Sequence, residues 1–534
     1  MTPLDQITPT NIGSLKERWR LPLGEGAFLA GSPLKVGEFL YLLTDSPAQV
    51  LALSLAHPDS VIWSWRPPPS PEPALSDWRI TPQGGLAWHS SGVLLVALAN
   101  GELAALATAN GREIWRVRNA DPATGAGHGA PPTVAGDLVL VGNSGAAYGV
   151  RGYLTAYRVA NGQLIWRGYS TGPDSEIPLL QPANPQYLTH AARELGVTTW
   201  PKDAWRRGGG TVDGLVTWDP ALDLIYHGTG PPAPWAAYLR PGDNKWASSI
   251  LARERTTGKV RWAFQLTPGD AWGYGAAVEP VLAEITIRGV ETKALILVAP
   301  SGIIYTLDRA SGRLLVAERA GPANWLSQLD VSSGRVSTVL GFLPKPSGPT
   351  QGICPATIGI KPGGAAAWFQ RRQLLVAALS NLCMDVTPAP PDFTPGQLFT
   401  GSTWRLTPGP GGSLGRIIGW DPTLGAVRWE VREPLPLLSG MLATASGIGF
   451  YATVDGWLKA LDLTNGAERW RHPLPGSSTA APISITDNEG RQLILIGTGQ
   501  VRWPGDPAFA GITLPISVES TPGYLVAFSL HQEK

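Results

Sequence analysis

The stretch GYLTAYRVANGQLIW at residues 152–166 contains the pattern that the rest of the chain repeats. A glycine opens it, alternating residues and an Asn-Gly pair follow, and a tryptophan closes it 14 residues after the first glycine. Close copies are GELAALATANGREIW at 101–115 and GWLKALDLTNGAERW at 456–470. Looser copies are GRIIGWDPTLGAVRW at 415–429, ARERTTGKVRW at 252–262, GIIYTLDRASGRLLV at 302–316 and the half-copy GYLVAFSL at 523–530. Repeats spaced by about 40–55 residues are typical of radial or solenoid architectures.

Each copy predicts two β-strands joined by a tight turn. Tyr153, Thr155 and Tyr157 alternate, so one face of their strand is buried and the other is not. The pair Asn161-Gly162 supplies the positive φ angles that such a turn needs. The tryptophan four residues later lies on the next strand, where we interpret it as a docking residue packed between neighbouring sheets. Small sheets that cannot bury both faces alone predict a β-propeller.

The predicted fold class is therefore all-β, with eight four-stranded antiparallel blades in a single domain over residues 1–534; seven blades stay open as an alternative. Segments 214–228 and 373–384 fill the two widest gaps between repeated tryptophans. A strand near Arg18–Leu23 is expected to pair with the last blade, because ring closure protects edge strands. The tryptophans expected between blades are Trp115, Trp166, Trp262, Trp429 and Trp470.

Composition excludes several function classes. The 534 residues include 64 Gly, 50 Pro and 22 Trp, and the net charge is only +1. Without a cluster of Lys and Arg, neither nucleic acid nor a charged membrane surface is an expected partner. No apolar run of about 18 residues predicts a transmembrane segment. A protein partner on the top face and a homodimer are left open, as is the removal of a leader peptide, since no signal peptide is visible.

The chain has two cysteines, Cys354 and Cys383. They are either two buried thiols or one structural disulfide, and a cysteine pair without a nearby histidine does not resemble a metal site. A disulfide would place the protein outside the cytoplasm, in the periplasm or otherwise exported.

Several long motifs then give a specific resemblance. They are GNSGAAYGVRGYLTAY at 142–157, YSTGPDSE at 169–176, TTWPKDAWRRGGGT at 198–211, GTGPPAPW at 228–235, RPGDNKW at 240–246, GIIYTLDR at 302–309, ICPATIG at 353–359, CMD at 383–385 and WPG at 503–505. In this order they resemble the large subunit of pyrroloquinoline quinone (PQQ) methanol and alcohol dehydrogenases. The resemblance implies an eight-bladed propeller with PQQ and a Ca²⁺ or lanthanide ion at its axis, and a bridged cysteine pair.

The resemblance also shows which site residues this chain has replaced. Such chemistry needs hard oxygen ligands on the metal, an Asp base and a flat stack for the quinone. The family's Glu ligand falls on Ala147, its Asn ligand on Pro231 and its catalytic Asp on Gly273. The additional Asp of the lanthanide type falls on Gly275, and the tryptophan below the quinone on Asp213.

Further cofactor contacts of the family fall on Ala30, Gly84, Pro300, Ser380 and Leu438, where the resemblance implies a Glu, an Arg, an Arg or Lys, an Asn and a Trp, with the cations on the carboxylates of the quinone. The region near Trp78 and Arg79 lacks the family's vicinal cysteines. The family-like residues that remain are Ser144, Gly145, Thr211, Trp503 and the two cysteines. We therefore expect a pseudoenzyme of quinoprotein descent: a scaffold or binding protein without cofactor or metal. The alternatives are a cofactor-free hydrolase resembling tetrathionate hydrolase, and a divergent alcohol dehydrogenase with a rebuilt site that uses PQQ with calcium or a lanthanide.

Three polar residues are candidates for a replaced axial site. Asp270 is interpreted mainly as a carboxylate that satisfies backbone amides in a Pro-Gly-Asp turn. His128 is interpreted as a loop residue rather than a base. Asp213 is the most interesting candidate, because it stands where the floor of the cofactor site is expected.

Overall fold

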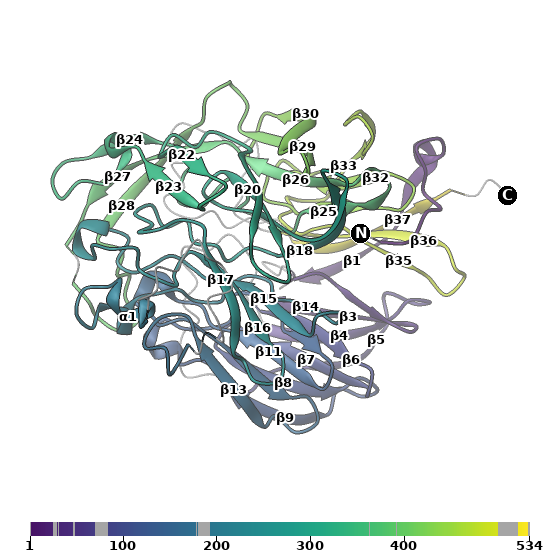
Figure 1. Ribbon diagram of the computed structural model, residues 1–534. Helices are drawn as coiled ribbons and strands as arrows, with labels where there is room; N and C mark the ends of the chain where they lie inside the picture. The colour runs from purple at the N-terminus through teal and green to yellow at the C-terminus, as the bar shows by residue number, and fades with distance from the viewer. Residues whose placement is uncertain are drawn as a thin grey trace.

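The computed structural model describes residues 2–24, 29, 31–45, 48–69, 84–177, 179, 193–362, 364–390, 392–499 and 522–531. β-Strands dominate these residues and helices are few and short (Figure 1). The helical turns include α1 (Leu195–Thr198) and the 3₁₀ turns η2 (Pro122–Thr124), η3 (Ala146–Tyr148), η5 (Ala204–Arg207) and η6 (Ala237–Leu239). The predicted all-β class is confirmed.

The described residues form eight four-stranded antiparallel sheets, which we number 1 to 8 in chain order. Sheets 1 to 4 contain β2 (Leu34–Val36), β3 (Phe39–Asp45), β4 (Ala48–Ser54) and β5 (Val61–Trp65); β6 (Gly85–His89), β7 (Val93–Ala97), β8 (Glu102–Ala107) and β9 (Glu113–Arg118); β10 (Thr133–Ala135), β11 (Leu138–Gly142), β12 (Tyr153–Arg158) and β13 (Leu164–Tyr169); and β14 (Thr217–Asp219), β15 (Leu224–Gly228), β16 (Ser249–Glu254) and β17 (Val260–Gln265).

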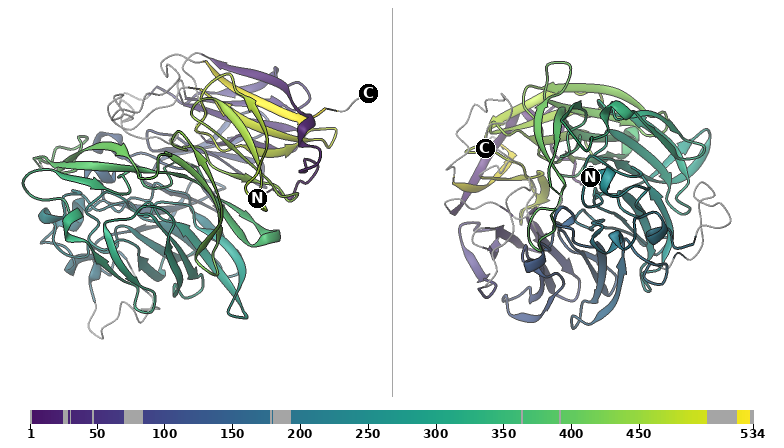
Figure 2. Two further views of the ribbon diagram at one scale, coloured as in Figure 1. Left: turned by 90° about the horizontal axis from the view of Figure 1, so that it is seen from above. Right: turned by 90° about the vertical axis from the view of Figure 1, so that its left-hand side faces the viewer.

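Sheets 5 to 8 contain β18 (Val281–Ile287), β19 (Val290–Val298), β20 (Ile303–Asp308) and β21 (Leu314–Arg319); β25 (Ala367–Phe369), β26 (Leu374–Ser380), β29 (Gly415–Asp421) and β30 (Ala426–Glu433); β31 (Leu442–Ala443), β32 (Ile448–Ala452), β33 (Trp457–Asp462) and β34 (Glu468–Pro473); and β35 (Ile483–Thr486), β36 (Gln492–Thr498), β37 (Gly523–Leu530) and β1 (Leu15–Gly24). The sheets are arranged around a common centre (Figure 2, right), as expected of a propeller.

The two ends of the chain meet in sheet 8. Strand β1 pairs antiparallel with β37 from Leu15 opposite Leu530 to Gly24 opposite Gly523, and both are drawn beside β35 and β36 in Figure 1. The predicted pairing of the N-terminal strand with the last sheet is confirmed. This pairing closes the ring and covers an edge that would otherwise remain open.

The repeated tryptophans join each sheet to the next. Trp166, Trp262 and Trp429 are buried as predicted, whereas Trp115 and Trp470 are half-buried. Each indole N–H donates to a backbone carbonyl of the following sheet: Trp115 to Val159, Trp166 to Arg255, Trp262 to Arg309, Trp429 to Leu463 and Trp470 to Leu15, over 2.8–3.2 Å. All five tryptophans lie in the last strand of their sheet, so the contact to the following sheet is the same whether or not the ring is fully buried.

These indole rings pack on the Thr-Gly and Asn-Gly turns of the neighbouring sheets. Gly258 has a φ of +70°, and a Cβ on it would lie 2.6 Å from the Trp166 ring. Any larger residue would therefore be strained in its backbone and would collide with the ring. The same glycine serves the hairpin turn and the contact between sheets 3 and 4, which explains why the two features recur together along the sequence.

Among the described residues, five additional strands form two smaller sheets of their own. They are β22 (Leu326–Asp330) with β23 (Arg335–Thr338), and β24 (Thr350–Ile353) with β27 (Leu382–Pro388) and β28 (Ser402–Pro408). Cys354 and Cys383 form a disulfide between the end of β24 and strand β27. The disulfide alternative for the two cysteines is therefore confirmed.

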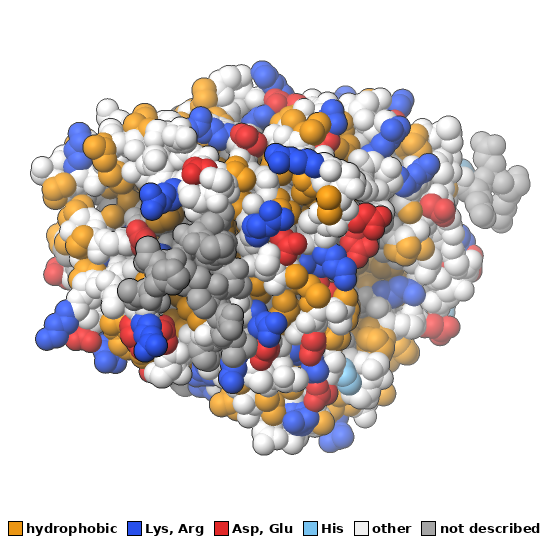
Figure 3. Space-filling model, viewed as in Figure 1, with side chains coloured by type: hydrophobic (Ala, Val, Ile, Leu, Met, Phe, Trp, Pro, Cys, Tyr) orange, Lys and Arg blue, Asp and Glu red, His pale blue; other side chains and the backbone are white. Residues whose placement is uncertain are grey.

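The surface shown in Figure 3 mixes positive and negative side chains without a region dominated by one sign. This mixture agrees with the net charge of +1. Within the described residues, no helix is both long and apolar enough to cross a membrane.

Replacing Trp262 by alanine tests the role of the indole contacts. Trp262 is 1% exposed and contacts both its own sheet and the following one. We expect Trp262→Ala to lower the free energy of unfolding by about 3–5 kcal/mol, measured by denaturant titration. Trp88→Ala is the control, because Trp88 is 38% exposed and should change stability by only about 0.5 kcal/mol. Equal changes in the free energy of unfolding for the two substitutions would contradict the proposed role of the indole contacts between sheets.

Removing the disulfide tests how much it stabilises the fold. The two cysteines are 29 residues apart, and closing a loop of this length restricts the unfolded chain by about 3 kcal/mol. The double variant Cys354→Ala/Cys383→Ala should lose that amount in equilibrium unfolding, and wild-type protein with a reducing agent should match it. Unchanged stability in both experiments would show that the bridge contributes nothing.

Candidate functional site

Residues at or before the start of the first strand of each sheet contact one another around the centre of the molecule. A Cβ on Gly85 would lie 2.6 Å from Cβ of Pro131, one on Gly129 2.6 Å from Cβ of Asp213, and one on Gly440 2.8 Å from Cβ of Ala481. Such contacts pass from sheet to sheet only where the sheets converge. We call this set the axial ring: Gly31, Gly85, Pro131, Asp213, Glu279, Gly364, Gly440 and Ala481.

Two positions that the resemblance assigns to metal ligands are Ala147 and Pro231. Ala147 is fully buried in η3, and its carbonyl accepts the Phe399 N–H over 2.6 Å. Pro231 follows β15, and its carbonyl accepts the Gly210 N–H over 3.0 Å. Neither side chain offers an oxygen, and both backbone carbonyls are engaged within the protein.

The positions of the two Asp residues are crowded as well. A Cβ on Gly273 would lie 2.7 Å from the Trp235 ring and 2.8 Å from Oγ1 of Thr357. A Cβ on Gly275 would lie 2.8 Å from Cδ of Pro231. Both glycines have positive φ angles, +77° and +65°, so neighbouring side chains fill the space that an aspartate would need.

Asp270 holds this turn together. Its carboxylate accepts the backbone N–H groups of Trp272, Gly273, Tyr274 and Gly275 and the hydroxyl of Ser248, over 2.8–3.3 Å. Five donors occupy the two oxygens, and the side chain is fully buried. Asp270 therefore organises the backbone of residues 272–275, and its oxygens are not available to a metal ion.

His128 is buried between sheets 2 and 3. Oδ1 of Asn119 accepts hydrogen bonds from Tyr157 and Arg167, so its Nδ2 faces the ring as a donor, 3.2 Å from Nε2 of His128. The lone pair of Nε2 is thereby occupied. Burial lowers the pKa of His128 to about 4, although hydrogen bonds to the backbone at Leu98 and Glu102 act in the opposite direction. His128 is thus a neutral bridge between sheets and lies in the loop before β10.

Two family-like hydroxyls are buried without a hydrogen-bond partner among the described residues. They are Oγ of Ser144, next to Gly145, and Oγ1 of Thr211. An unpaired buried hydroxyl costs about 1–3 kcal/mol, so both fit a polar ligand that exchanges hydrogen bonds with them. A quinone with carboxylate groups meets that requirement.

A metal ion of the family type does not fit the described residues. Within the described ranges, no group of three or more His, Cys, Asp or Glu side chains could hold a metal ion. Ca²⁺ takes six to eight oxygen ligands, largely carboxylates and carbonyls. We therefore assign no step of the chemistry to such an ion.

Asp213 stands in the axial ring, two residues after Thr211. Gly129 approaches it so closely that only a glycine fits there, with its Cβ position 2.6 Å from Cβ of Asp213. The structure thus brings Asp213 and Thr211 to the same part of the axis, while Asp270 and His128 serve the surrounding framework.

Other positions of the family site are occupied by structural residues. Ser380 donates its hydroxyl to the Leu437 carbonyl over 2.9 Å, Leu438 is buried, and Pro300 packs against Gly359. Gly84 has a φ of +92° beside the Ala97 carbonyl. Ala30, Trp78, Arg79 and Trp503 lie outside the described residues.

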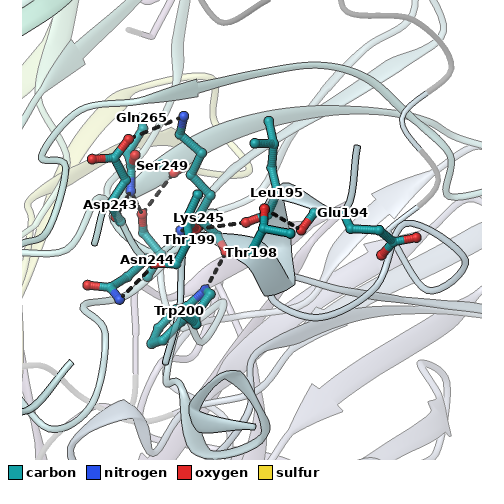
Figure 4. A network of polar contacts seen from close by, with 11 residues as sticks. Glu194, Leu195, Thr198, Thr199, Trp200, Asp243, Asn244, Lys245, Ser249 and Gln265 are labelled. Carbon is teal, nitrogen blue, oxygen red and sulfur yellow. Dashed lines mark hydrogen bonds and ion pairs between the residues drawn. The ribbon is translucent and has the colours of Figure 1, made fainter. Parts of the chain in front are cut away.

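A hydrogen-bond network fixes the segment RPGDNKW at 240–246 against α1 (Figure 4). The Thr199 hydroxyl donates to the Leu195 carbonyl and accepts the Lys245 N–H, over 2.7 and 2.9 Å. The Asn244 N–H donates to the Thr199 carbonyl over 3.1 Å. Oδ1 of Asn244 accepts a hydrogen bond from the Arg240 guanidinium, which also donates to the Asp270 carbonyl. The network therefore supports the turn at 272–275 from behind.

The Pro-rich run at 387–396 leads into a segment that covers η3. Phe393 and Phe399 pack edge to face with centroids 5.3 Å apart, and a Cβ on Gly149 would lie 3.0 Å from Phe393. The Arg207 guanidinium lies 3.9 Å from the centre of the Phe393 ring. This segment thus covers the turn that carries Ala147.

The sequence reasoning missed one charged pair at the axial ring. Nζ of Lys361 lies 2.7 Å from Oε2 of Glu279, and both side chains are buried. The signal was present, because Lys361 stands alone in the apolar stretch ATIGIKPGGAAAW at 356–368. A buried lysine in such a stretch indicates a specific partner.

Known proteins are similar to this chain over nearly its whole length. The family model for the β-propeller domain of glucose/ethanol/alcohol dehydrogenases (PQQ) matches residues 1–328, and the model for outer membrane protein assembly factor BamB matches residues 395–503. A lanthanide-dependent methanol dehydrogenase of Methylorubrum extorquens is 34% identical over 96% of this chain and 87% of the relative. Subunit 1 of a methanol dehydrogenase [cytochrome c] of Paracoccus denitrificans is 34% identical over 94% of this chain and 81% of the relative.

A solved structure is equally similar. A europium-containing methanol dehydrogenase superposes with a TM-score of 0.92 and 32% sequence identity, covering 99% of this chain and 95% of that one.

The expectation of a cofactor-free scaffold or pseudoenzyme is wrong. Relatives with 34% identity over nearly the full length are named as methanol dehydrogenases, one of them lanthanide-dependent, and these findings favour the dehydrogenase alternative. The expectation of no cofactor is wrong for the same reason. The error arose because we weighed a few replaced side chains above the retained framework, which still presents Ser144 and Thr211 at the axis.

The buried histidine makes stability depend on pH. His128 has a pKa of about 4 in the folded protein, below the ordinary value of 6.5, so the unfolded chain binds a proton first as pH falls. The contribution of His128 is complete above pH 6.5 and is lost as pH falls toward 4, by about 3 kcal/mol. We expect His128→Gln to reduce the loss of unfolding free energy between pH 7 and pH 4.5.

The exposed His57 provides the control for this measurement. His57→Gln makes the same substitution at an exposed histidine and should keep the pH dependence of wild-type protein. Identical pH profiles for His128→Gln and wild type would contradict the prediction.

Proposed function

The chain belongs to the β-propeller family of PQQ-dependent glucose, ethanol and alcohol dehydrogenases, and on that premise we propose that it is a quinone-dependent dehydrogenase that oxidises an alcohol. The observation that carries the proposal is the near full-length similarity to methanol dehydrogenases, with a TM-score of 0.92 to one solved structure. We further propose that residues 1–534 form one eight-bladed domain. The proposal that the substrate is an alcohol rests on the similarity to these methanol dehydrogenases.

Ser144 and Thr211 are proposed to bind the cofactor. Their hydroxyls are buried and lack partners among the described residues, and each can donate one hydrogen bond and accept two. When bound, a quinone of the PQQ type supplies the two-electron acceptor for alcohol oxidation. The protein orients the cofactor and excludes water from it. The buried turn at 272–275 and the segment over η3 help to exclude water by their packing.

Asp213 is proposed to accept the hydroxyl proton of the alcohol. It stands in the axial ring two residues after Thr211, and a carboxylate is a suitable general base when held next to the reacting group. The family position of the base is Gly273, whose surroundings leave no space for a side chain. The proton acceptor would thus have moved from the turn at 272–275 to the residue beside Thr211.

Two further observations support a proposed location of the protein and a proposed electron acceptor. The disulfide between Cys354 and Cys383 supports an oxidising compartment such as the periplasm. One relative is named a methanol dehydrogenase [cytochrome c], which supports a cytochrome c as the protein that receives the electrons from this chain.

The test is a dye-linked alcohol oxidation assay on protein incubated with PQQ, with and without Ca²⁺ or La³⁺. Wild-type protein should reduce the dye when a primary alcohol is added. Asp213→Asn should lower kcat by about 10²- to 10⁴-fold, the usual effect of losing a general base, while PQQ still quenches tryptophan fluorescence. The exposed Asp59 provides the control, and Asp59→Asn should keep full activity. Absence of both PQQ binding and turnover in wild type, whichever cation is added, would contradict the proposed function.

A further inference from the structure

A buried pair of opposite charges lies at the axial ring between sheets 5 and 6. Nζ of Lys361 is 2.7 Å from Oε2 of Glu279, and the two side chains are 4% and 10% exposed. Glu279 stands two residues before β18, and Lys361 six residues before β25. Because desolvation offsets most of the attraction within a buried ion pair, stability alone gives little reason for this pair.

The two partners are bound unequally. Glu279 uses its second oxygen, Oε1, to accept the Ala366 N–H over 2.7 Å, so the backbone of sheet 6 holds the carboxylate. Lys361 donates to Glu279 and, over 3.2 Å, to the Gly364 carbonyl. An ammonium group has three N–H donors, and the described residues give Lys361 acceptors for two of them.

A second buried pair has a different arrangement. Nζ of Lys459 lies 2.8 and 2.9 Å from the two carboxylate oxygens of Glu433, which also accepts the Tyr451 hydroxyl. Glu433 ends β30 and Lys459 lies within β33, so this pair joins sheets 6 and 7 rather than the axial ring. It offers a second lysine in an ion pair with a glutamate, 13% exposed, as a control.

The chain around Lys361 passes the positions where the family holds its cofactor. Thr357, four residues earlier, has its hydroxyl 2.8 Å from where a Cβ on Gly273 would lie. Gly359 packs on Pro300, with its Cβ position 2.5 Å from Cβ of Pro300. Pro300 and Gly84 are the positions at which the resemblance places cationic contacts to the quinone carboxylates. The Pro300 carbonyl accepts the N–H of Ile360, the residue before Lys361, over 3.0 Å. Lys361 thus brings a positive charge to the neighbourhood of Pro300, from which one cation has been lost.

We propose that Lys361 binds a carboxylate group of the anionic quinone cofactor, in place of the cationic residue replaced by Pro300. Glu279 positions the ammonium group and is itself held by Ala366. A charge-assisted hydrogen bond between an ammonium and a carboxylate is strong and specific for the anion. This inference rests on the proposed function, because it names a residue that holds the same cofactor.

The experiment measures the affinity for PQQ by quenching of tryptophan fluorescence, without added metal and with Ca²⁺. The reference variant is Glu279→Gln, in which the negative charge beside Lys361 is removed. It is compared with the double variant Glu279→Gln/Lys361→Gln, which differs from the reference only by the loss of the Lys361 ammonium group. The double variant should bind PQQ about tenfold more weakly or worse than the reference. Lys361→Arg should retain most of the affinity, and Lys459→Gln should keep the wild-type value.

A neutral probe separates binding from structure. The trimethyl ester of PQQ has no carboxylates, so both Glu279→Gln variants should bind it equally. If the double variant loses affinity for PQQ and for the ester alike, or for neither, the inference is overturned while the proposed function stands. If wild-type protein binds no PQQ with or without Ca²⁺, the proposed function fails and the inference fails with it.

Discussion

The contact between a tryptophan of one sheet and a glycine turn of the next is the constraint on which the structure depends. Each indole packs on a glycine that has no side chain in the way, and its N–H donates to a carbonyl of the same turn. A four-stranded sheet has two apolar faces, and neither can be buried without a neighbour. The repeated contact sets the spacing between sheets and so determines that they converge on an axis.

At the axis the requirements are different, because little space remains where the sheets converge. Small residues such as Gly85 and Gly440 allow the backbones to approach. Asp270 shows how a carboxylate can serve packing: it satisfies four buried N–H groups that would otherwise lack partners. The polar groups that remain at the axis, Ser144, Thr211, Asp213 and the Lys361–Glu279 pair, are few, and each therefore limits what the site can bind.

Much of the fold could be predicted from local pattern, because the relevant interactions repeat. The pairing of the N-terminal strand with β37, the hairpin turns and the burial of Trp262 all followed from spacing. The candidate site was harder. Replacement of Glu by Ala147 or Asp by Gly273 is visible in the sequence, yet it led us to underrate a similarity that extends over the whole chain. The roles of His128 and Asn119 could not be read from the sequence, because their partners lie in another sheet.

By itself, the sequence determined the propeller, its closure and the family, because glycine turns, strand alternation and tryptophan spacing act over short distances and recur. The tertiary structure alone decided the crowding around Gly273 and Gly275, the five donors on Asp270 and the meeting of Lys361 with Glu279. These features join residues from different parts of the chain, and Lys361 and Glu279 are 82 positions apart. Contacts of this kind depend on how the sheets converge, and no local pattern of residues encodes that geometry.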